Sequence, residues 1–374
     1  MPDTITYAPN QFKKTETSRH NFGLDVVRGT AILLVLICHC GIPYEQTMSQ
    51  FGFFGVELFF ALSGFLIGQI VIRDVLGNPS FKSLVHFYQR RWLRTLPLYY
   101  LVLMLLIIVA YFSVPQFSFP FANFVFLQNF SHSIDSFFNV SWSLSIEEWS
   151  YLLIPLLLLL LPVKKYSGLT ILIFTITFAA IILFARGYYV LKFSPDTDFA
   201  VRKSIPLRMD AIIYGFAMAN IKLHFPKWFQ FFCRAEIFLG ALLVFIILNF
   251  FVGNVLVYDF IGEKTIPASV GFTITGILFT LFLPFLSTSP VIKKVSRIKP
   301  INIFFSGLSK YSYCIYLIHL TIFEWMITSS FATWLWLLQV AVAASVTILI
   351  AAASYRYFEK PILDWRDRNV RIAT

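Results

Sequence analysis

Charged residues are scarce in this sequence of 374 residues: they make up 13% of the chain, whereas hydrophobic residues make up 58% and the mean hydropathy is +0.74. A soluble globular domain usually carries about 25% charged residues. So little charge could not cover the surface of a domain of this size in water. The composition therefore excludes an ordinary soluble protein and indicates a chain that crosses a membrane several times.

Several motifs of soluble enzymes are also missing. The chain contains no Walker or dinucleotide glycine motif, no CxxC pair, no HExxH motif and no internal repeat. We therefore expect no metal site. The net charge of +11 is explained by the distribution of charge across a membrane, so nucleic-acid binding is not needed to account for it. The cysteines lie in or beside apolar segments and indicate small core residues rather than disulfides: Cys38, Cys40, Cys233 and Cys314.

Apolar runs of about twenty residues predict an all-α polytopic membrane protein with about ten transmembrane helices. The first twenty residues are polar and lack a signal-peptide pattern, so residues 1–21 are expected to form a flexible cytoplasmic tail before a retained anchor helix. The transmembrane domain is expected over 22–362 and a basic cytoplasmic tail over 363–374. The predicted spans are 24–41, 52–72, 91–112, 143–161, 168–186, 206–222, 236–252, 267–287, 309–328 and 334–356.

The lysines and arginines give the expected orientation. Basic residues precede the first span and follow the second, fourth, sixth, eighth and tenth, whereas 113–141 and 329–333 contain none. The positive-inside rule places the basic segments and both termini in the cytoplasm, which predicts a multi-pass protein of the cytoplasmic (inner) membrane. The loop 187–205 is an exception, because it carries Lys192, Arg202 and Lys203 on the outer side. We expect this loop to form an exposed outer lobe.

One apolar segment, LDVVRGTAILLVLICH, carries both Arg28 and His39. Ionisable side chains are costly in lipid, so they indicate a function or a partner. Eleven residues of α-helix are close to three full turns, so both side chains face the same way about 16 Å apart along the axis. One helix face would then carry a fixed cation near the cytoplasmic surface and a titratable base near the outer surface. Asp25, one turn from Arg28, offers a purely structural alternative.

Two further arginines, Arg91 and Arg94, begin the third span at the same cytoplasmic surface, in RRWLRTLPLYY. Guanidinium groups suit phosphate because they donate two parallel hydrogen bonds, and the free N–H groups at a helix start favour anions further. We therefore expect Arg28, Arg91 and Arg94 to bind a phosphate-bearing ligand. Anchoring of the helix to lipid headgroups is the alternative for the paired arginines.

Near the outer surface, His39 shares its depth with Glu57, Glu147 and Glu148. Imidazole titrates near neutral pH, and a carboxylate on one ring nitrogen would leave the other nitrogen free to accept a proton. We expect His39 to be the base, with Glu147 or Glu57 orienting it or holding the acceptor. A polar cluster that only holds the helices together is the alternative. The residues expected to contact substrate are Trp142, Glu148, Arg208, Asp210 and His319, although His319 alone is also consistent with packing.

These motifs, in this order, resemble the membrane acyltransferase-3 family. The likeness covers about residues 22–362, and the chain departs from the usual pattern at Trp149 and Ser150, where glutamine and phenylalanine are common. We expect a stand-alone membrane domain, without the fused extracytoplasmic hydrolase-like domain that some members carry. The segments that carry the resemblance are the Arg28–His39 helix, FFGVELFFALSGFLIG, RRWLR with Pro97, WSLSIEE with Tyr151 and Pro155, GLSKYSYCIYLIHL, and YRYFEKP.

The resemblance implies an O-acyltransferase that moves an acyl group, usually acetyl, from acyl-CoA to a hydroxyl. Implied acceptors are cell-surface or secreted carbohydrates and glycolipids, such as lipopolysaccharide O-antigen or exopolysaccharide, and an association with envelope polysaccharide machinery. On this interpretation the three arginines hold the head of acetyl-CoA, and the acyl carbon reaches His39. The chemistry also requires a donor for the oxyanion.

Alternatives stay open at this point. Transfer through an acyl-enzyme on His39 or a neighbouring cysteine is possible chemistry, although direct transfer needs fewer steps. A transporter or flippase for a glycolipid or polyol would also place polar residues inside a helix bundle. A non-catalytic scaffold would need Arg28 and His39 for stability alone. Binding of the donor distinguishes these classes, because only the acyltransferase requires a site for CoA phosphates.

Overall fold

The computed structural model describes residues 21–40, 45–130, 137–163, 166–195, 197–251, 266–328 and 335–370. Within these ranges the chain forms α-helices with short π-helical turns and no strand, as the all-α prediction requires. The helices of the first half are α1 (Phe22–Cys38), α2 (Glu45–Ile70) with the π-helical turn η1 (Val71–Val75), α3 (Phe81–Ser113), α4 (Phe121–Phe124), α5 (Ser141–Leu159) and α6 (Gly168–Phe193).

The second half begins with a π-helical turn, η2 (Thr197–Arg202), that precedes a short helix. The remaining elements are α7 (Ile205–Arg208), α8 (Asp210–His224), α9 (Pro226–Phe232), α10 (Ala235–Ile246) with η3 (Ile247–Phe251), α11 (Ile266–Thr288), α12 (Pro290–Val295), α13 (Lys299–Thr328), α14 (Trp336–Ser354) with η6 (Tyr355–Glu359), and α15 (Lys360–Asn369). The final helix, α15, includes part of the segment that we expected to form a basic tail.

Helix α2 is the centre of the bundle, because it packs against α1, α5, α8 and α11. Its approach to α8 depends on glycine: a Cβ added at Gly64 would lie 2.0 Å from the carbonyl oxygen of Ile212, and one at Gly215 would lie 2.1 Å from that of Ala61. Small residues at a helix interface let the backbones come close together, as is common in membrane proteins. Helices α13 and α14 form a pair beside α1.

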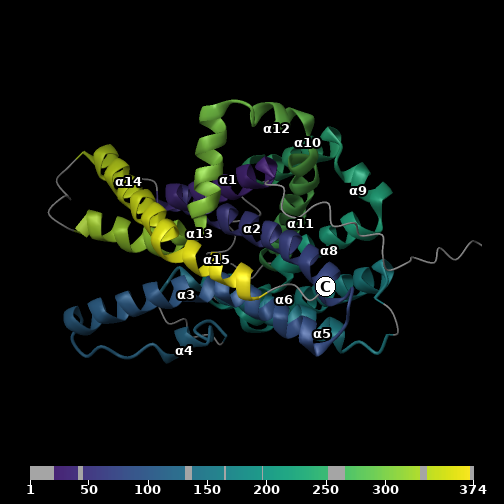
Figure 1. Ribbon diagram of the computed structural model, residues 1–374, viewed down its shortest axis with the longest axis horizontal. Helices are drawn as coiled ribbons and strands as arrows, with labels where there is room; N and C mark the ends of the chain where they lie inside the picture. Colours follow the sequence, from purple (N-terminus) through teal and green to yellow (C-terminus); the bar gives the residue numbers. More distant parts are fainter. Residues whose placement is uncertain are drawn as a thin grey trace, which may run out of the picture.

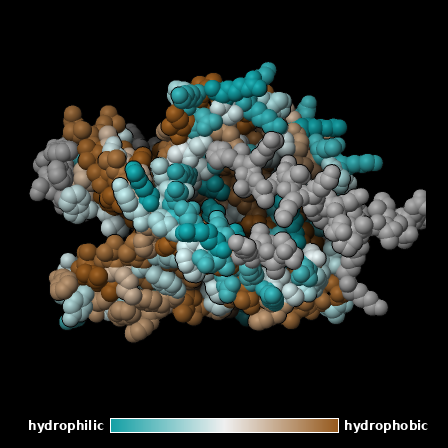
Figure 2. All heavy atoms as spheres, in the orientation of Figure 1, coloured by the Kyte–Doolittle hydropathy of each residue, from teal (hydrophilic) through white to brown (hydrophobic). Residues whose placement is uncertain are grey.

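Local signals explain where the helices of the site begin. Asn21 caps α1, since its side chain accepts a hydrogen bond from Leu24 N (3.2 Å) while its amide donates to Ser287 O on α11 (2.9 Å). Ser80 and Ser83 form a capping box at the start of α3. On the viewed face, hydrophilic residues gather along α15 between the hydrophobic ends of α3 and α14 (Figures 1 and 2).

Each of the ten expected spans overlaps one or two helical elements of the described residues. By length and apolarity, however, five helices of the described residues could cross a membrane, or six if the bent pair Pro226–Phe232 and Ala235–Asn249 is one span. Helices α1 and α8 contain 17 and 15 residues, fewer than the about twenty that a perpendicular span needs. A multi-pass helical membrane protein is therefore supported, whereas ten spans and the sides of the termini stay predictions.

A network of four buried charges joins α2, α6, α7 and α8. Arg208 donates to Glu57, and Arg186 Nη1 lies 3.0 Å from both carboxylate oxygens of Asp210. All four side chains are at most 1% exposed. Arg186 also donates to Thr273 on α11 (2.6 Å). Because a charge buried without a partner is far more costly than a buried pair, these contacts fix how the helices pack.

We predict that Glu57→Leu destabilises the fold by about 3–5 kcal/mol, because it leaves the guanidinium of Arg208 buried without its main counter-charge. The double variant Glu57→Leu/Arg208→Leu should recover most of the loss, since it removes both charges and keeps apolar volume. Thermal unfolding of the purified protein in detergent measures both effects. A double variant no more stable than Glu57→Leu would show that the ion pair does not hold α2 against α7.

Candidate functional site

The three arginines that we expected to act together line one cavity of about 720 Å³, called here the arginine cavity. Arg28 enters it from α1, and Arg91 and Arg94 enter it from α3. Glu147 of α5 also lines this cavity. The structure thus brings together the residues predicted to hold a phosphate-bearing ligand, although Arg28 lies more than sixty positions from the other two in the chain.

Two of these arginines have protein partners that hold them in place. Arg28 Nη1 donates to Ser309 Oγ (2.9 Å), and Ser309 Oγ donates to Asp25 Oδ1 (2.6 Å). Arg91 Nη2 lies 3.6 Å from Glu147 Oε2, and its guanidinium carbon lies 4.3 Å from the centre of the Tyr151 ring. Arg28 is therefore oriented by an aspartate that does not bond it closely, because Ser309 lies between them.

Arg94 differs from the other two arginines. Its side chain is exposed and lines the cavity, and no carboxylate of the described residues lies within ion-pair distance of it. A guanidinium that lines a cavity without a close ion pair attracts an anionic ligand. Arg94 is therefore the residue of the arginine cavity best placed to receive one.

A second, smaller cavity of about 150 Å³ contains the predicted base and is called here the histidine cavity. His39, His319 and Trp142 line it, and all three were singled out from the sequence. Arg202 and Lys203 also line it, from the loop that follows α6. The rings of His39 and His319 meet edge to face with their centres 4.9 Å apart.

The hydrogen bonds of the two histidines determine which ring nitrogen is free. His39 Nδ1 lies 2.9 Å from Val35 O, and His319 Nδ1 lies 2.8 Å from Tyr316 O. A carbonyl oxygen can only accept, so Nδ1 of the neutral ring carries the proton and Nε2 carries the lone pair. Each Nε2 is therefore the proton-accepting atom, which is the state that a general base needs.

Among the described residues, His39 makes no hydrogen bond with Glu57 or Glu147, the carboxylates that we expected to orient it or to hold the acceptor. Helix α1 ends at Cys38, and the backbone N–H of His39 bonds to Leu36 O and Ile37 O, so Val35 O can accept from the ring. Glu57 pairs with Arg208, and Glu147 pairs with Arg91 in the arginine cavity. The carbonyl oxygen of Val35 therefore orients the ring, a role that we had expected a carboxylate to have.

Three of the five expected substrate contacts also lie elsewhere. Arg208 and Asp210 are fully buried in the four-charge network, and Glu148 Oε1 accepts a hydrogen bond from Thr95 (3.1 Å) inside the bundle. None of the three lines the arginine or the histidine cavity as the described residues form them. Trp142 and His319 do line the histidine cavity. Residues that we expected at a similar depth in the membrane therefore face different neighbours in the structure.

Two side chains, Val56 of α2 and Tyr316 of α13, line both cavities and form the boundary between them. The hydroxyl groups of Tyr316 and Ser143 are hydrogen bonded (2.6 Å). Sequence reasoning did not single out Val56 or Tyr316, because nothing in an apolar segment marks a residue that touches two cavities. The arginine side of α1 and its histidine side are thus separated by one layer of side chains.

The loop cations were visible in the sequence only as an exception to the positive-inside rule. The guanidinium of Arg202 lies 4.6 Å from the centre of the Trp142 ring, and Asp198 pairs with both Arg202 and Lys203 (2.8 Å from Lys203 Nζ). The loop therefore lies over the histidine cavity and holds two cations there. No group of three or more histidine, cysteine or carboxylate residues able to hold a metal ion occurs in the described part of the chain.

The aspartate of this loop should make its structure depend on pH. Burial alone would raise the pKa of Asp198, but the pairs with Arg202 and Lys203 outweigh it and lower the pKa to about 2. A lowered pKa in the folded state gives stability that is present above the unfolded pKa of about 4 and is lost as the pH falls toward 2.

We predict that amide exchange in 197–205, corrected for the intrinsic rate, increases as the pH falls from about 4 to 2. Because the Asp198 side chain is 38% exposed, solvent screens part of the effect. The Asp198→Asn variant should show no such pH dependence, and the amides of 197–205 should exchange fast over the whole pH range. If the wild-type loop were equally protected at both ends of this range, the role of the aspartate in holding the loop would be contradicted.

Comparison with known proteins relates the chain to O-acetyltransferases. A Staphylococcus aureus (strain MRSA252) protein, provisionally named an O-acetyltransferase, is 25% identical over 400 residues, 96% of this chain and 61% of the relative. O-acetyltransferase OatA of S. aureus (strain NCTC 8325 / PS 47) is 25% identical over 388 residues, 94% of this chain and 58% of the relative. Peptidoglycan O-acetyltransferase OatA of Listeria monocytogenes is 32% identical over 152 residues, 36% of this chain and 24% of the relative.

The chain thus spans about three fifths of the length of the two staphylococcal relatives. No solved structure matches it significantly. The family model described as an acyltransferase domain matches residues 21–356, which include all helices from α1 to α14. The chain therefore belongs to the acyltransferase-3 family.

Proposed function

We propose that this protein is an integral-membrane O-acetyltransferase that moves an acetyl group from cytoplasmic acetyl-CoA to a hydroxyl of a cell-surface or secreted carbohydrate. The observation that carries the proposal is the meeting of the arginine cavity and the histidine cavity across Val56 and Tyr316. The proposal includes ten spans in the cytoplasmic membrane, with both termini in the cytoplasm and the histidine cavity toward the outside.

The donor fits the order of the two cavities. The phosphates of CoA would bind at Arg28, Arg91 and Arg94, and the flexible arm would carry the thioester past Val56 and Tyr316. Arg28 and His39 are separated by about 16 Å along α1, which is comparable to the length of that arm. Binding energy at the phosphates would then hold the reactive carbon in place, as catalysis by positioning requires.

The proposed reaction uses His39 as general base in direct transfer. His39 Nε2 accepts the proton of the acceptor hydroxyl while that oxygen attacks the thioester carbonyl. A C–O bond forms, the C–S bond then breaks, and the CoA sulfur leaves with the proton from the imidazolium. The Tyr316 hydroxyl lies on the boundary between the cavities and is our candidate donor to the oxyanion.

The acceptor is proposed from the relatives and from the histidine cavity. One relative is named a peptidoglycan O-acetyltransferase, which makes an envelope carbohydrate or glycolipid the natural class. Trp142 and His319 would contact the acceptor, because they line the cavity that contains the base. We also propose that the protein associates with envelope polysaccharide machinery, on the ground of the same relatives.

We predict that Arg28→Ala weakens acetyl-CoA binding by about tenfold or more, because a charge-assisted hydrogen bond to phosphate is worth about 1.5–3 kcal/mol. His39→Ala should keep the binding and lower turnover by about 10²–10⁴, as loss of a general base does. Calorimetric titration and CoA release by the purified protein in nanodiscs measure the two effects.

The matched control is Arg297→Ala, since Arg297 is exposed and lines neither cavity. It should behave as wild type in both assays. A folded wild-type protein that binds no acetyl-CoA would contradict the proposal and favour a transporter or a scaffold. Unchanged turnover in His39→Ala would remove the base from the mechanism while leaving donor binding intact.

A further inference from the structure

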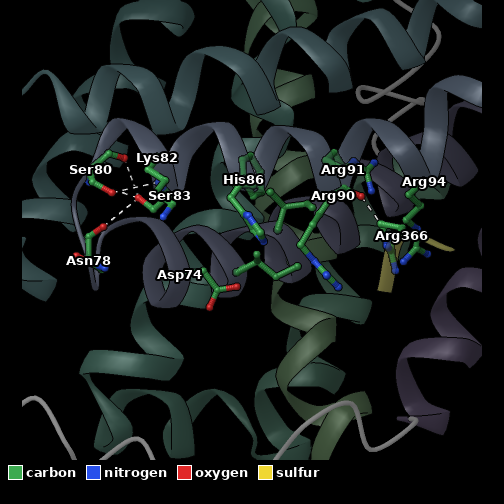
Figure 3. A pocket seen from close by; sticks show the side chains of 13 residues that line it. Asp74, Asn78, Ser80, Lys82, Ser83, His86, Arg90, Arg91, Arg94 and Arg366 are labelled. Carbon is green, nitrogen blue, oxygen red and sulfur yellow. Dashed lines mark hydrogen bonds between the residues drawn. The ribbon is translucent and has the colours of Figure 1, made fainter. Parts of the chain in front are cut away.

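A third cavity of about 540 Å³, called here the α3 cavity, extends from the arginine cavity along the first turns of α3. The two cavities share Arg91 and Arg94, so they are direct neighbours. Figure 3 shows Ser80 and Lys82 at one end of the α3 cavity and Arg91, Arg94 and Arg366 at the other. Arg366 belongs to α15, so the C-terminal helix completes a wall of the site.

The lining of the α3 cavity is strongly basic. Among its described residues Asp74 alone is acidic, and His86 lies on the same side of α3 as Arg90 in Figure 3. The Nε2 atom of His86 is buried and makes no hydrogen bond with the described residues. An anion would therefore meet a surplus of positive charge and an unused hydrogen-bonding atom. The cations of the lining are Lys82, Arg90, Arg91, Arg94 and Arg366.

Two of these cations are held together by a single carboxylate. Arg90 Nη2 lies 2.9 Å from Asp367 Oδ1, and Arg366 Nη2 lies 2.8 Å from the same oxygen. Arg366 Nη1 also donates to the backbone oxygen of Arg90 (3.3 Å), which fixes α15 on α3. Because one negative charge serves two guanidinium groups, the pair keeps a net positive charge. The Asp367 side chain is 55% exposed, whereas that of Arg366 is 13% exposed.

We propose that Arg90 and Arg366 bind the 3′-phosphate on the ribose of CoA, so that the α3 cavity holds the nucleotide head of the donor. This inference rests on the proposed function. The diphosphate and the 3′-phosphate leave the same ribose, so their binding sites must be neighbours. Arg90 and Arg94 lie one turn apart on α3, about 6 Å along the axis, which meets that requirement.

This assignment gives each cavity a different part of the donor. Arg91 and Arg94, shared by the two cavities, face the diphosphate. Arg90 and Arg366 bind the 3′-phosphate, and the arm extends into the arginine cavity toward Val56. The C-terminal helix α15 thereby becomes part of the donor site, because it supplies one of the two guanidinium groups.

The test compares CoA with 3′-dephospho-CoA, which lacks only the group in question. Titrations of both ligands into the full-length protein in nanodiscs of neutral lipid give two affinities for each variant. Wild type should bind CoA about tenfold or more tightly than dephospho-CoA, as expected for charge-assisted hydrogen bonds to one phosphate. Arg366→Ala and Arg90→Ala should lower the CoA affinity to that of dephospho-CoA and leave the dephospho-CoA affinity unchanged.

Two variants of the same helix serve as controls. Arg368→Ala removes an exposed arginine two positions away whose guanidinium donates to the backbone of its own helix, and it should keep the preference for CoA. Asp367→Ala loosens the docking of α15 but keeps both cations, so the preference should be kept or increased. If Asp367→Ala lost the preference for CoA, the preference would depend on the docking of α15 and not on the two guanidinium groups, which would contradict the proposal.

The outcomes separate this inference from the function on which it rests. Equal wild-type affinities for CoA and dephospho-CoA would overturn the 3′-phosphate site while leaving the donor proposal intact. Absence of binding for both ligands in a folded protein would overturn both. Retention of the preference in Arg366→Ala and Arg90→Ala would place the recognition of the phosphate at other residues.

Discussion

The desolvation of charge inside a bundle of apolar helices is the constraint on which the rest of this structure depends. A charge within the bundle is tolerated when a counter-charge neutralises it or when it faces a cavity. Glu57, Arg208, Arg186 and Asp210 take the first solution, and their pairs join four elements of the bundle. Arg94 takes the second, because it lines both the arginine cavity and the α3 cavity.

The paired charges hold the structure together, whereas the charges that face a cavity are the ones that we propose to take part in the chemistry. The paired network fixes α2, on which Val56 forms half of the boundary between the cavities. Helix α1 then presents Arg28 to one cavity, and His39 at its end lines the other. Because Nδ1–H of His39 donates a hydrogen bond to Val35 O, the base keeps its Nε2 free without a carboxylate. The proposed mechanism therefore needs neither Glu57 nor Glu147 to orient the base.

Much of the fold could be predicted from the sequence, because apolar runs and helix periodicity are local. The relation of Arg28 to His39 was also accessible, since both lie in one segment. The partners of the glutamates could not be predicted, because pairs such as Glu57 with Arg208 join residues far apart in the chain. A similar depth in the membrane does not specify the direction in which a side chain points. The role of α15 was missed for the same reason: a basic C-terminal segment resembles a tail, and only packing places Arg366 beside α3.

The central claim is that the donor reaches from the arginines, past the boundary formed by Val56 and Tyr316, to His39. The most direct test is a cryo-electron microscopy structure of the protein with a non-hydrolysable acetyl-CoA analogue. The account predicts the diphosphate against Arg91 and Arg94, and the acyl carbon beyond Val56 and Tyr316 within reach of His39 Nε2. An analogue bound with its phosphates outside the arginine cavity, or with its acyl group away from His39, would contradict the account.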